Sequence, residues 1–257
     1  LRYYRGYYDY LKQNGWQEGA FVYLWDEPNL KENYEQVLVL GQLVHEAAAE
    51  LKCLVVEQTY PHDPSWPDID PAVDIWCPNL SGLRPEDLEY MKQHGKRVWS
   101  YLVLSRLSDP YGSYRLPQWR VFDDGMTGFG FWAYDSVDGD VWDDADGSVS
   151  DYAVYYEGQD GPVPSVRWEA TREGAEDYKY LLLLTQAIAR AGEAGKAEAA
   201  ETAQGGLDAA VRATLAEAGD TATADRQRGL VLDALLDLGA ATGEIDPATL
   251  AGFSRPV

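Results

Sequence analysis

Residues 20–29 read AFVYLWDEPN, and this stretch decides how the chain is interpreted. Six apolar or aromatic residues follow one another over 20–25, and the turn-forming sequence of residues 26–29 closes the run. A short, bounded run rich in aromatic residues is typical of a strand that is buried on both faces.

Four later stretches repeat the pattern of a buried strand. They lie at residues 53–58, 73–77, 97–104 and 128–134. Helical patterns cover residues 3–13, 32–51, 85–93 and 115–124. Strands of this kind, mostly separated by helices, predict an α/β fold with a parallel sheet covered on both faces. A (β/α)₈ barrel is the leading interpretation, with strands 4 to 8 present here. The rival is an open doubly wound sheet, but the Gly-rich phosphate loop that nucleotide binding requires does not follow the first strand.

The composition changes after residue 168. All nine tryptophans lie between Trp16 and Trp168, and after Tyr180 the only aromatic residue is Phe253. Alanine dominates this last part, where helices are expected over 168–190, 196–218 and 222–240. We therefore expect a partial catalytic barrel over residues 1–168 and a helical region packing on it over residues 169–257.

The charge of the chain excludes some classes of partner. Lysine plus arginine is 21 and aspartate plus glutamate is 43, so the net charge is −22. Such a chain does not bind nucleic acid electrostatically, and anionic lipid would repel it. No apolar run is long enough for a transmembrane helix, and two cysteines cannot form a disulfide framework. The first residue is leucine and no signal peptide is visible, so we expect a processed chain or a piece of a longer one, with its compartment undetermined.

The functional residues of a parallel α/β fold lie at the carboxyl ends of its strands. The residues expected there are rich in carboxylates, amides and aromatic rings. They are Trp25, Asp26, Glu27, Tyr60, Asn79, Tyr101, Trp132, Tyr134 and Asp135. Aromatic rings and carboxylates together suit a carbohydrate, which offers C–H faces for stacking and hydroxyls for hydrogen bonds. The set lacks the histidine clusters of a metal site and the Ser/His/Asp pattern of a hydrolase triad, so we expect no metal and no cofactor.

The adjacent carboxylates Asp26 and Glu27 are the sharpest of these candidates. Two neighbouring carboxylates that are poorly solvated repel one another, so the pKa of one should rise and leave a general acid beside a carboxylate. The alternative is that both simply complement the dipole of the helix that follows.

A second catalytic carboxylate is harder to find in the sequence. A retaining glycosidase with two carboxylates holds them about 5 Å apart. The strand over 97–104 is followed by Ser105 rather than an acid, and Asp135 follows the next strand. An adjacent pair without a separate nucleophile favours a substrate-assisted mechanism. There the 2-acetamido group of the substrate attacks the anomeric carbon, the first carboxylate orients that amide, and the second protonates the leaving oxygen.

The sequence resembles the catalytic domain of glycoside hydrolase family 123, the β-N-acetylgalactosaminidases and their relatives. The resemblance covers about residues 1–185 and rests on several segments taken together. These are YLWDEP (23–28), GKRVWSY (95–101), YRLPQW (114–119), GFGFWAY (128–134), PSVRWE (164–169) and REGAEDY (172–178). It implies a (β/α)₈ domain usually preceded by a β-sandwich, so that the sandwich and the first barrel strands would be missing here. It also implies that Asp26 orients the amide and that Glu27 is the acid/base.

Three alternatives stay open from the sequence. Glu27 and Asp135 could form a two-carboxylate glycosidase, or the barrel could bind carbohydrate without turnover. The acidic loop over 138–146 is either solvated or a weak calcium site, although the EF-hand frame fails there. Arg172, Glu173 and Asp177 are interpreted as a structural ion-pair network.

Overall fold

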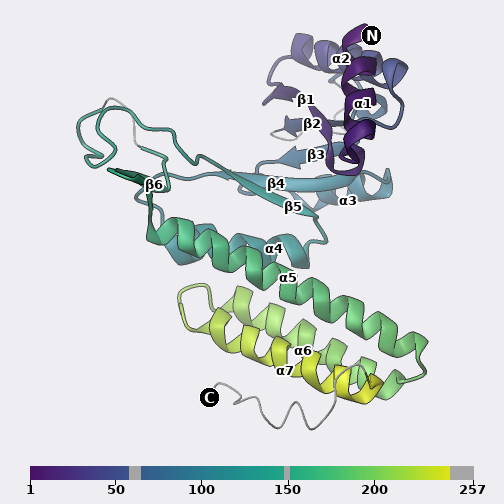
Figure 1. The fold of residues 1–257 in the computed structure, drawn as a ribbon, viewed down its shortest axis with the longest axis vertical. Coiled ribbons are helices and arrows are strands. Elements are labelled where there is room, and N and C mark those ends of the chain that lie inside the picture. The colour runs from purple at the N-terminus through teal and green to yellow at the C-terminus, as the bar shows by residue number, and fades with distance from the viewer. Residues whose placement is uncertain (58–64, 148–150, 244–257) are drawn as a thin grey trace. The chain divides into compact units, whose positions relative to one another are not determined.

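The computed structural model describes residues 1–57, 65–147 and 151–243 (Figure 1). Contacts divide the chain into two units. Leu1–Val103 and Met126–Trp132 form the sheet unit, and Leu104–Gly125 and Ala133–Val257 form the helical unit. The expected boundary near residue 168 is a different division, based on composition, and stays a prediction.

The sheet unit contains five parallel strands in chain order. Its elements are α1 (Arg2–Asn14), η1 (Gln17–Gly19), β1 (Phe21–Asp26), α2 (Lys31–Ala47), β2 (Lys52–Glu57), η2 (Asp70–Ala72), β3 (Ile75–Pro78), α3 (Pro85–Gln93), β4 (Arg97–Val103) and β5 (Gly128–Trp132). The strand order is β1-β2-β3-β4-β5, and every pairing is parallel. The parallel sheet expected from the apolar runs is therefore confirmed.

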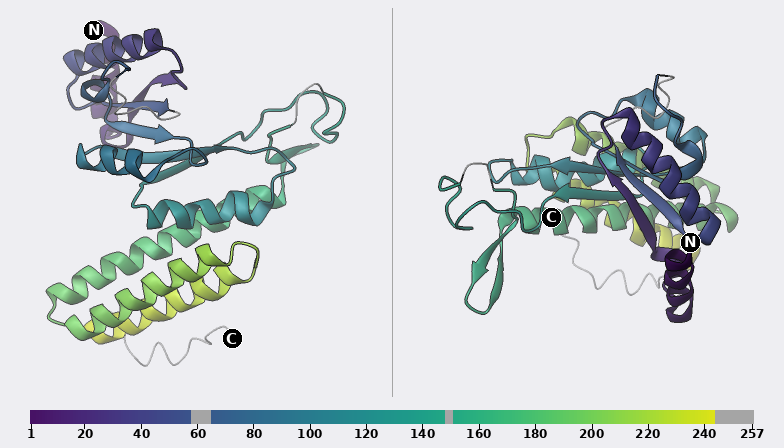
Figure 2. Two further views of the ribbon diagram at one scale, coloured as in Figure 1. Left: turned by 180° about the vertical axis from the view of Figure 1, so that it is seen from behind. Right: turned by 90° about the horizontal axis from the view of Figure 1, so that it is seen from above.

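Each face of the sheet carries its own set of buried apolar residues. On one face, Val55 and Trp76 are fully buried and α2 packs along β1 and β2, with Val37 and Val44 also fully buried (Figure 2). The other face, which we call the inner face, carries a cluster in which Leu54, Val56, Ile75 and Cys77 are packed against three partly buried aromatic residues, Phe21, Trp99 and Tyr101. Burial on both faces explains why the strands are continuously apolar rather than alternating.

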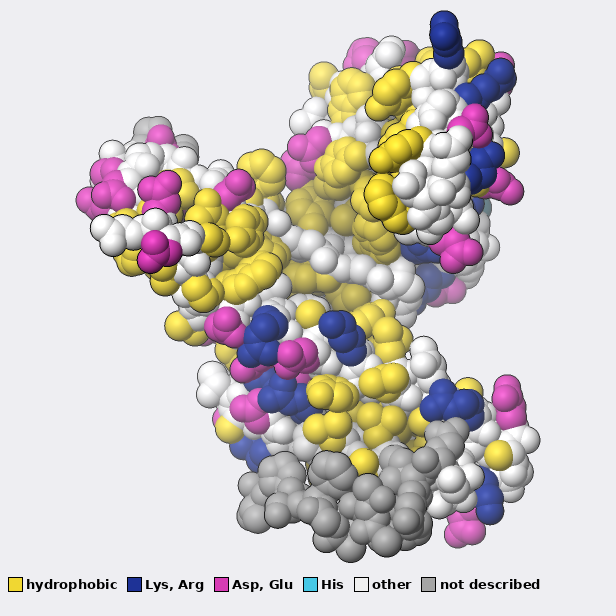
Figure 3. Space-filling model, in the orientation of Figure 1, with side chains coloured by type: hydrophobic (Ala, Val, Ile, Leu, Met, Phe, Trp, Pro, Cys, Tyr) yellow, Lys and Arg dark blue, Asp and Glu magenta, His cyan; other side chains and the backbone are white. Residues whose placement is uncertain are grey.

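Helix α1 exposes much of its aromatic surface. Tyr3 is 75% exposed, and Tyr10 is also exposed together with Trp16, which follows the helix. Hydrophobic side chains are visible along α1 in the space-filling view (Figure 3). Gly15 ends the helix with a φ of 72°, the left-handed conformation typical of a helix C-terminus.

A polar network joins α2 to the amino ends of β2 and β3. The Asp74 carboxylate accepts hydrogen bonds from the Cys53 backbone N–H (2.8 Å) and contacts His45 Nε2 (2.9 Å) and Lys52 Nζ (3.3 Å). Burial alone would raise the pKa of Asp74, but these contacts outweigh it and hold the pKa below its usual value. Cys53 and Cys77 are both buried free thiols, as expected from the sequence.

The helical unit is built on three long helices. It contains η3 (Tyr111–Arg115), α4 (Leu116–Asp123), the hairpin of β6 (Tyr155–Gly158) and β7 (Gly161–Pro164), and then α5 (Val166–Glu193), α6 (Ala197–Ala216) and α7 (Thr223–Thr242). The three expected C-terminal helices are confirmed, whereas the hairpin is not visible in the sequence patterns. Leucine and alanine side chains from α5, α6 and α7 form one core with Trp119 of α4. Ser165 caps α5, because its hydroxyl accepts a hydrogen bond from the Trp168 N–H (3.3 Å).

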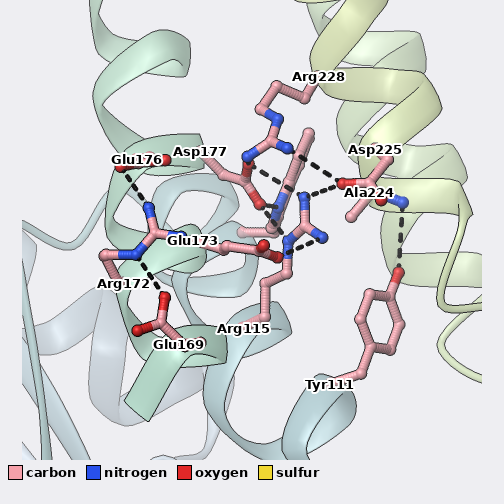
Figure 4. Close-up of polar contacts among 11 residues, drawn as sticks. Tyr111, Arg115, Glu169, Arg172, Glu173, Glu176, Asp177, Ala224, Asp225 and Arg228 are labelled. Atoms are coloured by element: carbon pink, nitrogen blue, oxygen red, sulfur yellow. Dashed lines mark hydrogen bonds and ion pairs between the residues drawn. The ribbon is translucent and has the colours of Figure 1, made fainter. Parts of the chain in front are cut away.

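A buried ion pair lies between η3 and α5 (Figure 4). The Asp177 carboxylate accepts hydrogen bonds from Arg115 Nε (2.7 Å) and Trp119 Nε1 (2.9 Å). Arg115 also pairs with Glu173 (3.0 Å) and Asp225 (2.8 Å). Burial alone would lower the pKa of Arg115, but these carboxylates hold it above its usual value. The network joins four helical segments, η3, α4, α5 and α7, so the structural interpretation of Glu173 and Asp177 agrees with their contacts.

Arg172 lies outside that buried cluster. It pairs on the surface of α5 with Glu169 and Glu176, each at 2.7 Å. Exposed pairs of this kind contribute little to stability. The three residues interpreted together therefore belong to two separate sets of ion pairs on one helix.

The Asp74 network predicts a pH-dependent contribution to stability. Because the pKa of Asp74 is lowered on folding, its contribution is present above the unfolded pKa of about 3.9 and is lost as the pH falls through the folded value. We expect Asp74→Asn to lower the free energy of unfolding by about 1–2 kcal/mol at pH 7. Urea unfolding at pH 7 and near pH 3 measures the difference. Asp9→Asn, which removes an exposed pair, is the control and should change little. An Asp74→Asn effect that does not shrink with falling pH would show that the carboxylate charge is not its source.

Two helical glycines should respond in opposite ways to alanine. A Cβ on Gly41 of α2 would lie 2.5 Å from the Ala72 carbonyl oxygen, whereas a Cβ on Gly6 of α1 meets nothing within 4 Å. We expect Gly41→Ala to destabilise the protein by about 1–3 kcal/mol through the backbone clash. Gly6→Ala should stabilise it by about 0.5–1 kcal/mol, because alanine is the better helix former. Chemical denaturation of both variants tests the pair, and equal effects would contradict the close packing of α2 on η2.

Candidate active site

An extra residue in β1 determines where its carboxylates lie. Tyr23 pairs with Leu54, but Trp25 pairs with Val55 and Asp26 with Val56, so the register shifts between Tyr23 and Trp25. Successive residues of a regular strand face opposite sides of a sheet, so a bulge reverses the alternation. Here it places Tyr23 and Asp26 together on the inner face.

The side chains of Tyr23 and Asp26 are in direct contact. The Tyr23 hydroxyl donates a hydrogen bond to Asp26 Oδ1 at 2.9 Å. Burial raises the pKa of Tyr23, and the Asp26 carboxylate raises it further, so the hydroxyl stays protonated and remains a donor. Asp26 is itself exposed, which leaves its carboxylate open to a ligand.

Glu27 follows in an unusual backbone conformation. Its φ is 46°, the only positive φ at a non-glycine position among the described residues. Its N–H donates to the Val56 carbonyl oxygen at 3.0 Å, which extends the pairing with β2 by one residue. A left-handed conformation costs an L-residue free energy and is found where surrounding contacts enforce it, often at functional sites.

The Glu27 carboxylate reaches across the sheet to β4. The Tyr101 hydroxyl donates a hydrogen bond to Glu27 Oε1. Tyr101 in turn is bridged to Asn79, which follows β3, and its carbonyl oxygen accepts from the Leu80 N–H at 2.8 Å. The Asn79 side chain closes its own turn by accepting from the Ser81 N–H at 3.0 Å. The ends of β1, β3 and β4 are thereby connected.

The inner face beside these groups is aromatic. Trp132, the last residue of β5, pairs with Val103 and is 54% exposed. Gly128 leaves room for the Trp99 ring, because a Cβ there would lie 2.6 Å from it. Burial raises the pKa of the Cys77 thiol to about 12, so this thiol is neutral and unsuited to act as a nucleophile.

The structure brings together some of the residues expected at the site. Asp26, Glu27, Asn79, Tyr101 and Trp132 all lie at the carboxyl ends of strands of the sheet unit.

Three other expected residues lie elsewhere. Trp25 pairs with Val55 and so faces the opposite side of the sheet from Asp26. Tyr60 lies outside the described residues. Tyr134 and Asp135 belong to the helical unit, where the Tyr134 ring stacks on Tyr155 at 4.7 Å and Asp135 is exposed.

Sequence reasoning missed Tyr23 as a partner of Asp26. In a regular strand, residues three apart face opposite sides, so the pattern placed Tyr23 away from the carboxylate. Only the bulge brings the two together, and no turn or glycine in YLWD signals it.

Carboxylates of the acidic loop accept hydrogen bonds from backbone N–H groups in and beside the loop. Asp140 Oδ1 accepts from the Trp142 N–H (2.9 Å), Asp146 Oδ2 accepts from the Asp140 N–H (2.6 Å), and Asp144 Oδ1 accepts from the Asp151 N–H (2.9 Å). Within residues 1–57, 65–147 and 151–243, the one group whose ligand atoms converge as a metal site would require is His45, Cys53 and Asp74. That group is the network at the amino ends of β2 and β3, and its hydrogen bonds already account for it.

Residues 3–184 match the family model described as the glycoside hydrolase 123 catalytic domain. The chain belongs to this family. The resemblance found in the sequence is thus confirmed, and glycoside hydrolysis is the general activity that the family supports. A comparison with curated proteins finds no match. None of the helices in the described parts of this family 123 domain combines the length and apolar character needed to cross a membrane.

The backbone of Glu27 can be tested separately from its side chain. Alanine and glycine both remove the contact with Tyr101, but only glycine relieves the left-handed conformation. We expect Glu27→Gly to be more stable than Glu27→Ala by about 0.5–1 kcal/mol, the relief of strain less the added chain entropy. The same two substitutions at Glu89, in the interior of α3, are the control, and there glycine should be the less stable by about 1 kcal/mol. The free energy of unfolding in urea checks both pairs, and the same order at both positions would contradict a strained Glu27.

Proposed function

We propose that this family 123 domain hydrolyses β-linked N-acetylhexosaminides, N-acetylgalactosaminides in particular, with retention and with assistance from the substrate. The observation that carries the proposal is the arrangement of two consecutive carboxylates, each with its own tyrosine partner. Tyr23 contacts Asp26 and Tyr101 contacts Glu27, so the two groups point to different positions although they are neighbours in the chain.

In the first step, the Asp26 carboxylate accepts a hydrogen bond from the N–H of the 2-acetamido group and orients it. The carbonyl oxygen of that group bonds to the anomeric carbon as the bond to the leaving oxygen breaks, and protonated Glu27 gives its proton to that oxygen. In the second step, Glu27 takes a proton from water, the water oxygen bonds to the anomeric carbon, and the acetamido group is restored. Two displacements at one carbon retain its configuration.

The remaining site residues would bind the sugar ring. Trp132 offers an exposed aromatic face at the end of β5, which suits the C–H face of a pyranose. Tyr101 and Asn79 offer polar groups at the ends of β4 and β3. Tyr60, Tyr134 and Asp135 stay predictions from the sequence, whereas we assign Trp25 to packing because it faces the other side of the sheet.

The strand order supports a barrel over an open doubly wound sheet. Each strand lies beside the one before it in the chain, and the order does not reverse, as it does in a doubly wound sheet. We propose that residues 1–168 supply strands 4 to 8 of a (β/α)₈ barrel and that residues 169–257 are a helical addition. Earlier strands, and a preceding β-sandwich, would then come from a part of the protein that is not in this sequence.

The assignment of Asp26 and Glu27 predicts the effect of removing each charge. Glu27→Gln should lower kcat by about 10²–10⁴-fold for good and poor leaving groups alike, because the same group acts as acid in the first step and as base in the second. Asp26→Asn should also lower it strongly. Release of 4-nitrophenol from the β-N-acetylgalactosaminide and hydrolysis of the corresponding methyl glycoside measure both variants. Glu86→Gln is the control, since it changes an exposed carboxylate on α3.

Two further measurements separate the mechanisms. A thiazoline that mimics the cyclised intermediate should inhibit, and a β-galactoside that lacks the acetamido group should be hydrolysed very slowly. Equal rates on the two glycosides would overturn substrate assistance, and covalent labelling of Asp135 by a 2-fluoro glycoside would replace it with the two-carboxylate mechanism. Binding of the amino sugar without hydrolysis by the whole protein would indicate a barrel that binds without turnover.

A further inference from the structure

Trp142 is an exposed aromatic residue with no part in the proposed reaction. It lies in the acidic loop over residues 138–146 of the helical unit and is 59% exposed. Acidic and hydrophobic side chains lie together over the segment that precedes β6 (Figure 3). Exposed apolar residues are common on protein surfaces, so exposure alone does not indicate a binding site. The contacts of Trp142 are therefore the evidence that matters.

The Trp142 ring is held in a fixed orientation. It stacks on Tyr156 of β6, with 4.5 Å between ring centroids and 19° between their planes. Its Nε1 donates a hydrogen bond to the Glu157 carbonyl oxygen at 3.1 Å, and its backbone N–H donates to Asp140 Oδ1 at 2.9 Å. A ring fixed in this way loses little conformational entropy when a ligand binds to it.

Two arginine side chains, Arg106 and Arg167, contact Tyr156. The Arg106 guanidinium lies 5.0 Å from the centroid of the Tyr156 ring, and Arg167 Nη2 donates to the Tyr156 hydroxyl at 3.3 Å. Arg106 is nearly buried and pairs with Asp151 at 3.1 Å. The stack of Arg106, Tyr156 and Trp142 therefore rests on buried charged groups rather than on a mobile surface.

One face of the indole remains available. Tyr156 covers one face, and the large exposed fraction of Trp142 leaves the opposite face in water. Three carboxylates of the loop, Asp140, Asp143 and Asp146, are also exposed. A single flat aromatic surface among carboxylates differs from the apolar patch that a protein partner covers.

We propose that Trp142 is the platform of a carbohydrate-binding site for uncharged oligosaccharides. The C–H face of a pyranose would stack on the open face of the indole, and the loop carboxylates would accept hydrogen bonds from its hydroxyls. The same carboxylates would repel sulfated or uronate-containing glycans. The site uses none of the residues of the proposed catalytic step, so binding at Trp142 can be tested without turnover.

The test is calorimetric titration of the full chain with cellotriose, an uncharged trisaccharide that lacks the acetamido group on which the proposed hydrolysis depends. We expect Trp142→Ala to weaken binding by about tenfold or more, and Trp142→Phe to retain most of the affinity because it keeps an aromatic face. Trp16→Ala is the matched control, because Trp16 is 57% exposed and lies in the sheet unit. It should leave the affinity unchanged.

Four outcomes would overturn the proposal. These are no binding of the trisaccharide, equal weakening by Trp142→Ala and Trp16→Ala, tighter binding of a chondroitin sulfate oligosaccharide than of the uncharged probe, or a dimer in sedimentation that Trp142→Ala dissociates. Thermal unfolding of Trp142→Ala checks that the variant is folded, and Trp142→Phe gives a second reading if it is not. Loss of oligosaccharide binding in Trp142→Ala, with binding kept in Trp16→Ala, supports the site at Trp142. Loss of hydrolysis in Glu27→Gln supports the catalytic assignment. Each can fail without the other.

Discussion

The extra residue in β1 sets the direction of the side chains that follow it. Without the register shift after Tyr23, Asp26 would face α2 and the buried side of the sheet, where an ionised carboxylate is costly. With it, Asp26 reaches the inner face and meets the Tyr23 hydroxyl. The left-handed backbone at Glu27 then directs the next carboxylate toward β4 and Tyr101. Two neighbouring acids thus acquire different partners.

The spacing of the two carboxylates depends first on the local backbone of β1 and only second on the packing of other strands. A two-carboxylate glycosidase needs acids from two strands held about 5 Å apart, so its geometry depends on the packing of the whole barrel. Here the relative position of the carboxylates is fixed by the backbone torsions of two consecutive residues. Tyr101 and Tyr23 add a hydroxyl from β4 and one from β1 to hold that position.

The sequence predicted much of the fold because its signals are strong and local. The apolar runs at 20–25 and 97–104 became β1 and β4 within a few residues, since continuous burial leaves little alternative to a strand in a parallel sheet. The β6–β7 hairpin was not predicted, because its two strands are only four residues each and β7 contains two prolines.

The site was predicted less completely than the fold, for a physical reason. Residue type identified Asp26 and Glu27, whose acidity is evident from the sequence, but orientation depends on the alternation of the strand. A single bulge inverts that alternation, which moved Tyr23 toward Asp26 and Trp25 away from it. Bulges are governed by local packing rather than by composition, so a prediction based on strand periodicity fails at such a position.

The net charge of −22 also gains meaning from the structure. Asp177 is neutralised inside the helical unit by Arg115, and Asp74 is held in its ionised form by His45, Lys52 and a backbone N–H. The acids of the loop at 138–146 satisfy their own turns. Asp26 differs from all of these, because its described partner is a neutral hydroxyl and its carboxylate is exposed. An acid without a compensating cation is free to accept a hydrogen bond from a neutral ligand, and an amide N–H is a donor of that kind.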